Sequence, residues 1–426
     1  MEKFSPTNRN ITRRHALKMG IGTAGLGLLN QYLPGFARSA EAITPKTRST
    51  ILIMLTGGMS RLDSLDYKPK AVSDIRGPFK GIPAANGEYF SELFPHLAKT
   101  SNRFALLQSM KSTSSGEHQQ AYREWLNAAD VHLPTTLSKN GRIPYVDAVT
   151  PNVLPLMEPE RNELRLNEAL QIIWDDQKKE YALEQFAGIQ PELVFNENGE
   201  LVTPPKRQNI ADTNIDDRVR LRNALNELSP LRTDKTQRMD ELIRVAHMIK
   251  TQPVVEELKA SLDDQVLNRY GNNPYGTIMK MAGIFASRLQ TGMVIVETGH
   301  WDHHWNIEGR MQPQAQMLDQ SVAALIEEYA DECVICMRGE FGRTPRLNDG
   351  SGSEAKRAGR DHDAVHTGLI AGPTIRPGVY GCTTQCGRAI DANPITDGQF
   401  ANTVLAAANG TVSKHGITIP RILTFK

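Results

Sequence analysis

Acidic and imidazole side chains gather in three short segments of the second half of the chain. Asp302 and His304 lie one residue apart in GHWDHHWN, so both can point the same way from an extended loop. Glu340 lies in RGEFGRTP, and Asp361 and His362 lie together in AGRDH. Oxygen and nitrogen donors of this kind suit Zn²⁺, Mn²⁺, Mg²⁺ or Ca²⁺ better than a metal that prefers thiolates. We therefore expect these five residues to bind a divalent metal, whose identity and number the sequence does not define.

Arginine and serine side chains beside these segments could act on a bound anion. Arg343 follows Glu340 in a glycine-containing loop. Its guanidinium can bind a phosphate or sulfate oxygen there, or pair with Glu340 to steady the loop. Ser114 and Ser115 lie in a polar turn before an expected helix, where a hydroxyl can act as a nucleophile or simply cap the helix. Both interpretations stay open for each residue.

A glycine pair and two aspartates follow the first apolar run of the chain. Thr50–Leu55 reads TILIML, which predicts a buried parallel strand. Gly57 and Gly58 then allow the backbone to approach a ligand closely. Asp63 and Asp66 come a few residues later in the same loop. Asp63 is a further candidate metal ligand, and turn or cap formation, which Asp also favours, is the alternative.

Strands alternate with helices in most of the remaining sequence. The predicted strands are 104–110, 293–297, 332–337 and 366–371, and the predicted helices are 93–100, 117–129, 275–290, 314–329 and 399–408. Such alternation predicts an α/β fold with a parallel sheet covered by helices on both faces.

Residues 131–270 interrupt this alternation. Prolines and scattered charges prevail over 131–210, where we expect a helix at Glu180–Phe186 and a strand near Leu201. Residues 215–270 are charged and have a strongly helical pattern. We interpret 131–270 as a mainly helical insertion in one large domain that spans 43–426.

The first 42 residues have the features of a twin-arginine (Tat) export signal. Arg13 and Arg14 precede a weakly apolar, glycine-rich run at Ile21–Leu33, and residues 40–42 read AEA, a small-residue cleavage site. The apolar run is too short for a spanning helix, and an amphipathic N-terminal helix is the alternative. We expect the Tat translocase to export the protein to the periplasm or the cell exterior, without a stable membrane span.

Composition and cysteine placement narrow the class of protein. The chain has 426 residues, 39% of them hydrophobic, and a formal net charge of +1, which gives no reason to expect a nucleic-acid partner. Cys333 and Cys336 fall in a predicted strand, whose alternation would place them on opposite faces as buried structural residues. Cys382 and Cys386 lie in a turn-rich loop and could form a disulfide in an exported protein.

Several motifs together resemble the bacterial exported proteins of domain-of-unknown-function family 1501. They are GGMSRLDSLDYKPK, WDHH, GEFGRTPRLN, GRDH, TDGQFANTVLAAANG and the twin-arginine leader, and they cover essentially the mature chain. That family is similar to the alkaline phosphatase and sulfatase superfamily. The resemblance implies a three-layer αβα sandwich with a large, mostly parallel sheet (alkaline phosphatase-like). It also implies one or two divalent metals beside an attacking hydroxyl and a bound phosphate or sulfate.

The resemblance extends to individual residues. The positions that match metal-site segments of the superfamily are Asp302, His304, Glu340 and His362, with Arg343 beside them. The nucleophile position falls near His118, just after Ser114 and Ser115. The expected function is an exported, metal-dependent hydrolase of phosphate or sulfate esters, acting on a small-molecule or polysaccharide ester. The alternative is a non-catalytic periplasmic or surface-binding protein that has kept the fold and lost the nucleophile.

Overall fold

The computed structural model describes most of the chain outside its N-terminus. The described residues are 48–129, 131–138, 143–150, 170–175, 180–185, 194–196, 201–202, 262–349, 358–385, 387, 390–392, 394–411 and 416–425. All of them belong to Thr47–Lys426, one of two compact units into which the chain divides. Residues 1–42 lie outside the described residues, so the Tat signal and its cleavage stay predictions.

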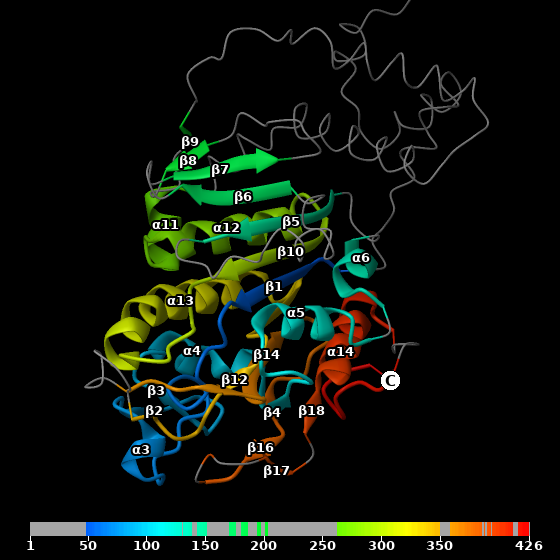
Figure 1. Ribbon diagram of the computed structural model, residues 1–426. Coiled ribbons are helices and arrows are strands. Elements are labelled where there is room, and N and C mark those ends of the chain that lie inside the picture. The colour runs from blue at the N-terminus through cyan, green and yellow to red at the C-terminus, as the bar shows by residue number, and fades with distance from the viewer. Residues whose placement is uncertain are drawn as a thin grey trace, which may run out of the picture. The chain divides into compact units, whose positions relative to one another are not determined.

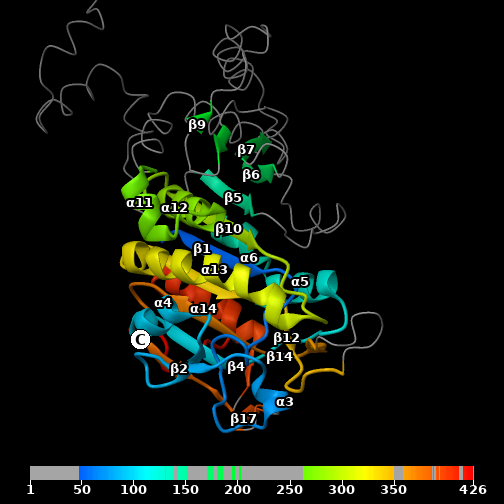
Figure 2. The same ribbon diagram turned by 90° about the vertical axis from the view of Figure 1, so that its left-hand side faces the viewer.

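The central feature of this unit is a 12-stranded sheet in the order β15-β4-β14-β11-β1-β10-β5-β6-β7-β8-β9, with β18 paired to β4. Its strands are β1 Thr50–Leu55, β4 Ala105–Lys111, β5 Ile143–Val149, β6 Leu170–Asp175, β7 Glu180–Gln185, β8 Val194–Asn196, β9 Leu201–Val202, β10 Thr291–Thr298, β11 Val334–Arg338, β14 Val365–Ala371, β15 Gly378–Tyr380 and β18 Ile395–Thr396. β1 pairs in parallel with β10 and β11, and β5 and β6 continue the parallel set. Figure 2 shows β5, β6 and β7 toward one end of the sheet and β4 toward the other.

Among the strands around β1, β14 is reversed, and β7 and β9 are reversed toward the far end of the sheet. β14 runs antiparallel to both of its neighbours, β11 and β4, so the sheet is mixed and not all-parallel. Because β4 is reversed relative to β14, it runs in the same direction as β11 and β1. The N-terminal end of β14 therefore lies at the same edge as the C-terminal ends of β1, β4, β10 and β11. Residues just before β14 thereby join the loops that follow the other strands.

Helices pack on both faces of the sheet (Figure 1). The described residues form eight α-helices: α3 Ser73–Arg76, α4 Pro95–Thr100, α5 His118–Leu126, α6 Leu133–Ser138, α11 Asp264–Tyr270, α12 Pro274–Ser287, α13 Ile307–Tyr329 and α14 Asp397–Asn409. α4, α11, α12 and α13 share a core with Ile51, Ile53 and Leu55 of β1, whereas α5, α6 and α14 share one with Leu52 and Met54. Successive strand residues face opposite sides, so both faces of the apolar run TILIML are buried.

Two predictions about the chain can be compared with these elements. The helix expected at Glu180–Phe186 is wrong, because Glu180–Gln185 forms β7 and pairs with β6. Hydrogen bonding to the apolar strand LQIIWD overrides the helix preference of Glu, Ala and Leu there. The described part of 143–202 extends the sheet, and the helical pattern predicted over 215–261 lies outside the described residues. The boundaries of the insertion stay a prediction.

Three two-stranded ribbons accompany the main sheet within the described residues. They are β2 Gly81–Pro83 with β3 Tyr89–Ser91, β12 Gly342–Arg343 with β13 His362–Asp363, and β16 Cys382–Thr383 with β17 Ile390–Ala392. Cys333 and Cys336 are buried in the cores on opposite faces, as predicted. Cys386 lies outside the described residues. No helix in the described part of the chain is both long and apolar enough to cross a membrane.

Candidate metal centre

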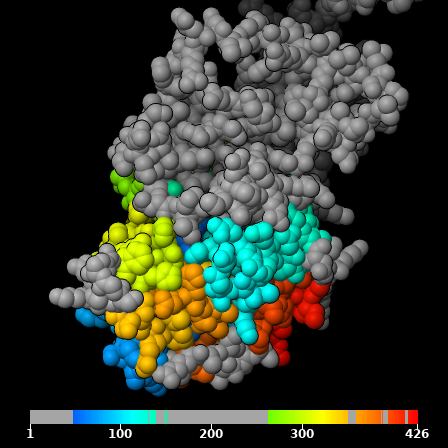
Figure 3. All heavy atoms as spheres, in the orientation of Figure 1, coloured from blue at the N-terminus to red at the C-terminus, as the bar shows by residue number. Residues whose placement is uncertain are grey.

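Loops from distant parts of the sequence meet at the edge where β1, β4, β10 and β11 end. The backbone N–H of Trp301 donates to Thr56 O at 2.8 Å, which ties the loop after β10 to the loop after β1. The β12–β13 ribbon pairs Arg343 with His362 and adds the segment that precedes β14. In Figure 3 the cyan segment that contains α5, the yellow start of α13 and the orange segments lie side by side on one face.

Asp302 is the centre of this group. Its Oδ1 lies 3.0 Å from His304 Nε2 and 3.4 Å from His362 Nε2, and the two ring nitrogens are 3.2 Å apart. Three ligands of a tetrahedral zinc ion, each at about 2.0–2.1 Å, stand about 3.3 Å from one another. The mutual spacing of these three atoms therefore matches the spacing of ligands around one cation.

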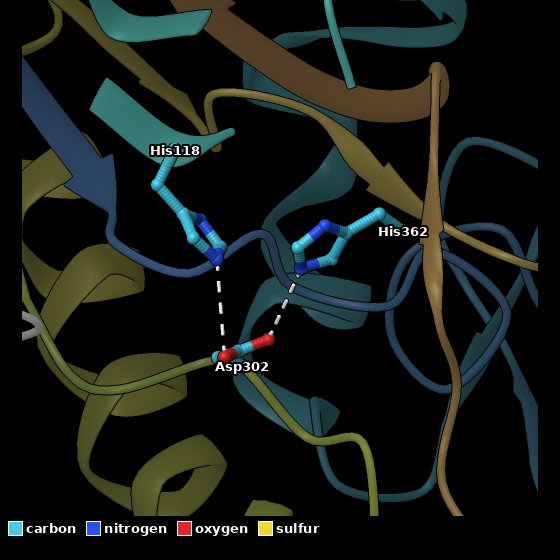
Figure 4. Close-up of side chains that lie close together, drawn as sticks. All are labelled: His118, Asp302 and His362. Atoms are coloured by element: carbon cyan, nitrogen blue, oxygen red, sulfur yellow. Dashed lines mark ion pairs between the residues drawn. The ribbon is translucent and has the colours of Figure 1, made fainter. Parts of the chain in front are cut away.

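His118 approaches the other oxygen of the same carboxylate. Its Nε2 lies 3.8 Å from Asp302 Oδ2. The ligand atoms of His118, Asp302 and His362 all lie within 4.8 Å of one another, and these three form the metal-competent group found among the described residues. Figure 4 shows both imidazole rings directed at the carboxylate. We call His118, Asp302, His304 and His362 the metal cluster. The position near His118, reached by resemblance, thus belongs to the site.

Two of the predicted ligands, Glu340 and Asp361, contact histidines of the metal cluster on the side away from Asp302. Glu340 is fully buried, and its Oε1 lies 2.5 Å from His118 Nδ1 and accepts from Gly57 N at 2.9 Å. Its Oε2 accepts from Tyr122 Oη at 2.9 Å. Asp361 Oδ1 lies 2.9 Å from His304 Nδ1. A carboxylate that accepts the second N–H of an imidazole fixes its orientation and leaves Nε2 as the donor atom for a metal.

The sequence left open whether Arg343 binds an anion or pairs with Glu340, and in the structure its guanidinium contacts other protein atoms. Nε donates to Gly58 O at 2.9 Å, and one terminal nitrogen donates to Arg360 O at 3.1 Å and approaches His304 Nε2 at 3.3 Å. The other terminal nitrogen donates to Gly57 O and pairs with Asp302 Oδ1. These contacts engage all three nitrogens of the guanidinium. The side chain is 1% exposed, so it positions Asp302 and does not reach a ligand.

The charge state of the acids follows from these contacts. Burial by itself would raise the pKa of Asp302, but the hydrogen bond from His362 and the Arg343 guanidinium hold it well below its usual range. Burial likewise acts to raise the pKa of Asp361, and hydrogen bonds from His304 and Asn348 lower it overall. The central carboxylate is therefore ionised at neutral pH, which is the state that binds a cation.

Asp63 belongs to a structural ion pair and does not join the metal cluster. Arg360 Nε donates to Asp63 Oδ2 at 2.5 Å, and the Ser60 hydroxyl donates to the same oxygen. Both partners of this pair are fully buried. Asp66 is held in a similar way by Arg61 and Lys68 at 2.8 and 2.7 Å. A buried carboxylate with this many donors is committed to the fold of the loop. These contacts favour the alternative of a structural role for Asp63, and its role as a ligand stays a prediction.

The serine candidates lie in the turn that leads from β4 into α5. Ser114 and Ser115 are half-buried and precede His118, the first residue of α5. Ser112, which opens the turn, is buried and donates to Glu340 O at 2.6 Å. This hydrogen bond ties the turn to the segment that carries Glu340. The structure thus brings the turn to the metal cluster through His118, and the nucleophile role of Ser114 and Ser115 stays a prediction.

Sequence reasoning missed some supporting groups. Tyr122 follows His118 by one helical turn, so the two side chains leave α5 on the same side and both reach Glu340. That spacing was the available signal. Asn348, whose amide donates to Asp361 Oδ1 at 3.2 Å and to His304 O at 2.8 Å, ends the GEFGRTPRLN motif and had no separate signal.

Three solved structures resemble this chain at a distance. One, of Ps i-CgsB in complex with k-i-k-neocarrahexaose, has a TM-score of 0.39 and 10% identity, and the match covers 87% of this chain and 75% of that chain. A Bacteroides thetaiotaomicron structure titled for glycosaminoglycan metabolism has a TM-score of 0.33 and 12% identity, with 84% and 72% covered. A third, in complex with its substrate D-glucosamine-2-N,6-O-disulfate, has a TM-score of 0.31 and 12% identity, with 88% and 82% covered. Likeness at this level carries no argument about activity.

Sequence comparison gives a firmer result. No curated protein matches this sequence. One family profile, described as "Protein of unknown function (DUF1501)", matches residues 47–128 and 187–414, which together make up most of the chain. The matched ranges contain all four members of the metal cluster and both carboxylates behind them. The chain belongs to the DUF1501 family.

Proposed function

We propose that this protein is a metal-dependent hydrolase of phosphate or sulfate esters, built on a three-layer αβα sandwich similar to that of alkaline phosphatase. One observation carries the proposal. The imidazoles of His118, His304 and His362 converge on the Asp302 carboxylate at the sheet edge where strand-following loops meet. In α/β sheets this edge is where ligands and chemistry collect.

The donor set also favours certain metals. Three neutral imidazoles and one carboxylate suit Zn²⁺ or Mn²⁺, whereas Mg²⁺ and Ca²⁺ prefer oxygen donors throughout. A divalent cation held there would polarise an ester oxygen and lower the pKa of a water molecule or hydroxyl beside it. Glu340 would keep His118 in the tautomer that presents Nε2, and Asp361 would do the same for His304.

The start of α5 supports an anionic substrate. α5 begins at His118, and its N-cap residue Glu117 makes no side-chain cap. Backbone N–H groups and the helix dipole at such an end favour a phosphate or sulfate group. Ser114 and Ser115 in the preceding turn are the candidate nucleophiles, because a hydroxyl there would face an ester bound between α5 and Asp302.

The alcohol part of the ester has space beside α13. A cavity of about 530 Å³ is lined by polar residues at the start of this helix, Asn306, Glu308 and Gln312, together with apolar residues such as Leu347. Trp305 lies in sequence between the ligand His304 and Asn306 of the cavity lining, and its side chain is 43% exposed. Polar side chains with an exposed aromatic ring suit a sugar, so we propose a small-molecule or polysaccharide ester as substrate, met outside the cytoplasm after Tat export.

Two measurements on the purified chain test the function. We expect Zn²⁺ or Mn²⁺ to bind, and the loaded protein to hydrolyse an aryl phosphate or an aryl sulfate. His118→Ala should lower metal affinity and abolish hydrolysis, while His96→Ala, at an exposed histidine on α4, should leave both unchanged. The double variant Ser114→Ala, Ser115→Ala should retain metal but lose hydrolysis. Bound metal without hydrolysis of either ester class would instead favour the non-catalytic binding protein.

A further inference from the structure

Four oxygen atoms converge on the Arg343 guanidinium. Three are the backbone carbonyls of Gly57, Gly58 and Arg360, and the fourth is Oδ1 of Asp302. Carbonyl and carboxylate oxygens in such a set are the ligands that hard divalent cations take in proteins. The protein fills this position with its own side chain, which the surrounding groups bury almost completely.

The backbone here is shaped to present those carbonyls. Gly57 and Gly58 have φ values of +98° and +76°, which L side chains rarely adopt. A Cβ at Gly57 would lie 2.6 Å from Asp302 N, so a larger residue would displace the loop that carries Asp302. The glycine pair therefore presents the carbonyl oxygens that bind the Arg343 guanidinium. The sequence had predicted only a close approach of this backbone to a ligand.

We propose that Arg343 is a built-in cation that takes the place of a second metal ion, so that the centre binds a single divalent metal. The proposal rests on the proposed function, because it assumes the metal cluster. Asp302 Oδ1 contacts both the guanidinium and the ring nitrogens of His304 and His362. Its one negative charge is thus shared between Arg343 and a metal bound by the imidazoles.

A second divalent ion could use the same oxygens only by displacing the guanidinium. Like charges at contact distance repel strongly in a buried site, where solvent screens them little. Displacement would also leave a buried arginine without its four oxygen partners, which is costly.

The number of bound metals tests this directly in the unaltered full-length chain. The protein is stripped with a chelator, titrated with Zn²⁺ and separately with Mn²⁺, and analysed by calorimetry and by metal content after gel filtration. We expect one ion per chain. Two ions per chain would overturn the proposal for Arg343 and leave the metal cluster intact. No bound ion would overturn the metal cluster and the Arg343 proposal together.

Substitution with chemical rescue tests the role of the guanidinium itself. We expect Arg343→Ala to bind Zn²⁺ about 10–100-fold more weakly, as for other groups that orient ligands. Added guanidinium ions should restore most of this loss. Arg61→Ala is a matched control, because Arg61 is equally buried and pairs with Asp66, and guanidinium should not change its metal affinity. Unchanged affinity in Arg343→Ala, or loss that guanidinium does not reverse in a folded variant, would contradict the proposal. Circular dichroism identifies the folded variants.

Discussion

In each imidazole–carboxylate pair at the centre, the imidazole is the metal ligand and the carboxylate orients it. His118 and His304 each direct Nδ1 at a carboxylate, Glu340 or Asp361, and each direct Nε2 toward Asp302. The carboxylate fixes the tautomer and the ring angle, so the ring loses little rotational entropy when a metal binds. The two pairs differ in burial, because the Glu340 side chain is fully buried and the Asp361 side chain is 56% exposed.

This difference in burial predicts unequal effects of two matched substitutions. Glu340→Gln should weaken metal binding about 10–100-fold, because a neutral amide oxygen is a weaker acceptor for His118 and Gly57 than the charged carboxylate oxygen. Asp361→Asn should have a smaller effect, because water can replace an exposed partner. Calorimetric titration with Zn²⁺ measures both. Equal losses in the two variants would show that burial of the carboxylate is irrelevant.

A second prediction at this scale concerns the glycine that adjoins Asp302. Gly57→Ala should lower the free energy of unfolding by more than the roughly 1–2 kcal/mol expected for a positive φ alone, and should also weaken metal binding. Gly87→Ala is the control, because Gly87 has φ +90° but no atom lies within 4 Å of the position that a Cβ would take there. Urea denaturation and Zn²⁺ titration of both variants distinguish backbone strain at a positive φ from a steric clash between the new Cβ and Asp302. Similar behaviour of the two would rule out a collision at Asp302.

The residues of the centre were easier to predict than their roles. Residue type and position beside strands identified Asp302 and His304, which follow β10, and His362, which precedes β14. Glu340 and Arg343 have equally suitable side chains, yet their partners are backbone groups and histidines from other loops. Sequence separation hides such contacts, so a ligand and the group behind it cannot be distinguished without the fold.

At the scale of elements, one buried acid joins two helices on the same face of the sheet. Asp319 on α13 accepts from the backbone N–H groups of His96 and Leu97, both at 2.8 Å, at the start of α4. These are N–H groups that an isolated helix leaves without partners. Burial nevertheless raises the pKa of Asp319 to about 7 and outweighs the two hydrogen bonds, which act to lower it.

This raised pKa predicts a pH-dependent stability. In the unfolded chain the carboxyl loses its proton near its ordinary value of 3.8, whereas in the folded chain it keeps the proton up to about 7. Between these values the folded state binds more protons, so the Asp319 contribution to the free energy of unfolding falls as pH rises. Urea denaturation at about pH 5 and pH 8 should show less of this fall in Asp319→Asn than in the wild type. Asp331→Asn, at an exposed acid, is the control; equal slopes in all three proteins would exclude Asp319 as the cause.

Elements with strong local patterns were predictable, and those decided by pairing were not. TILIML of β1 and the helices α12 and α14 carry clear apolar patterns, and the structure forms them close to the predicted bounds. The direction of β14 depends on its hydrogen bonds to β11 and β4, which no local pattern encodes. β7 was missed for the same reason, since its residues favour a helix until β6 supplies a partner.

At the scale of the whole molecule, the N-terminal segment is expected to determine where the protein acts. Replacing both Arg13 and Arg14 by Lys should leave the precursor in the cytoplasm, because the twin-arginine pair is the feature read at export. Cell fractionation with immunoblotting measures the distribution, and a Lys3→Arg, Arg9→Lys variant serves as a charge-neutral control. Normal export of the double variant would show that Arg13 and Arg14 are not an export signal.

The position of β1 has a consequence for synthesis on the ribosome. This strand is made early, yet both of its partners, β10 and β11, begin only at Thr291 and Val334. At the usual rate of translation, TILIML waits roughly 10 s or longer before it can pair. An apolar strand without partners is prone to aggregate, so the nascent chain depends on chaperones over this interval. The metal cluster, whose residues come from both sides of this gap, assembles only after the last of these strands has left the ribosome.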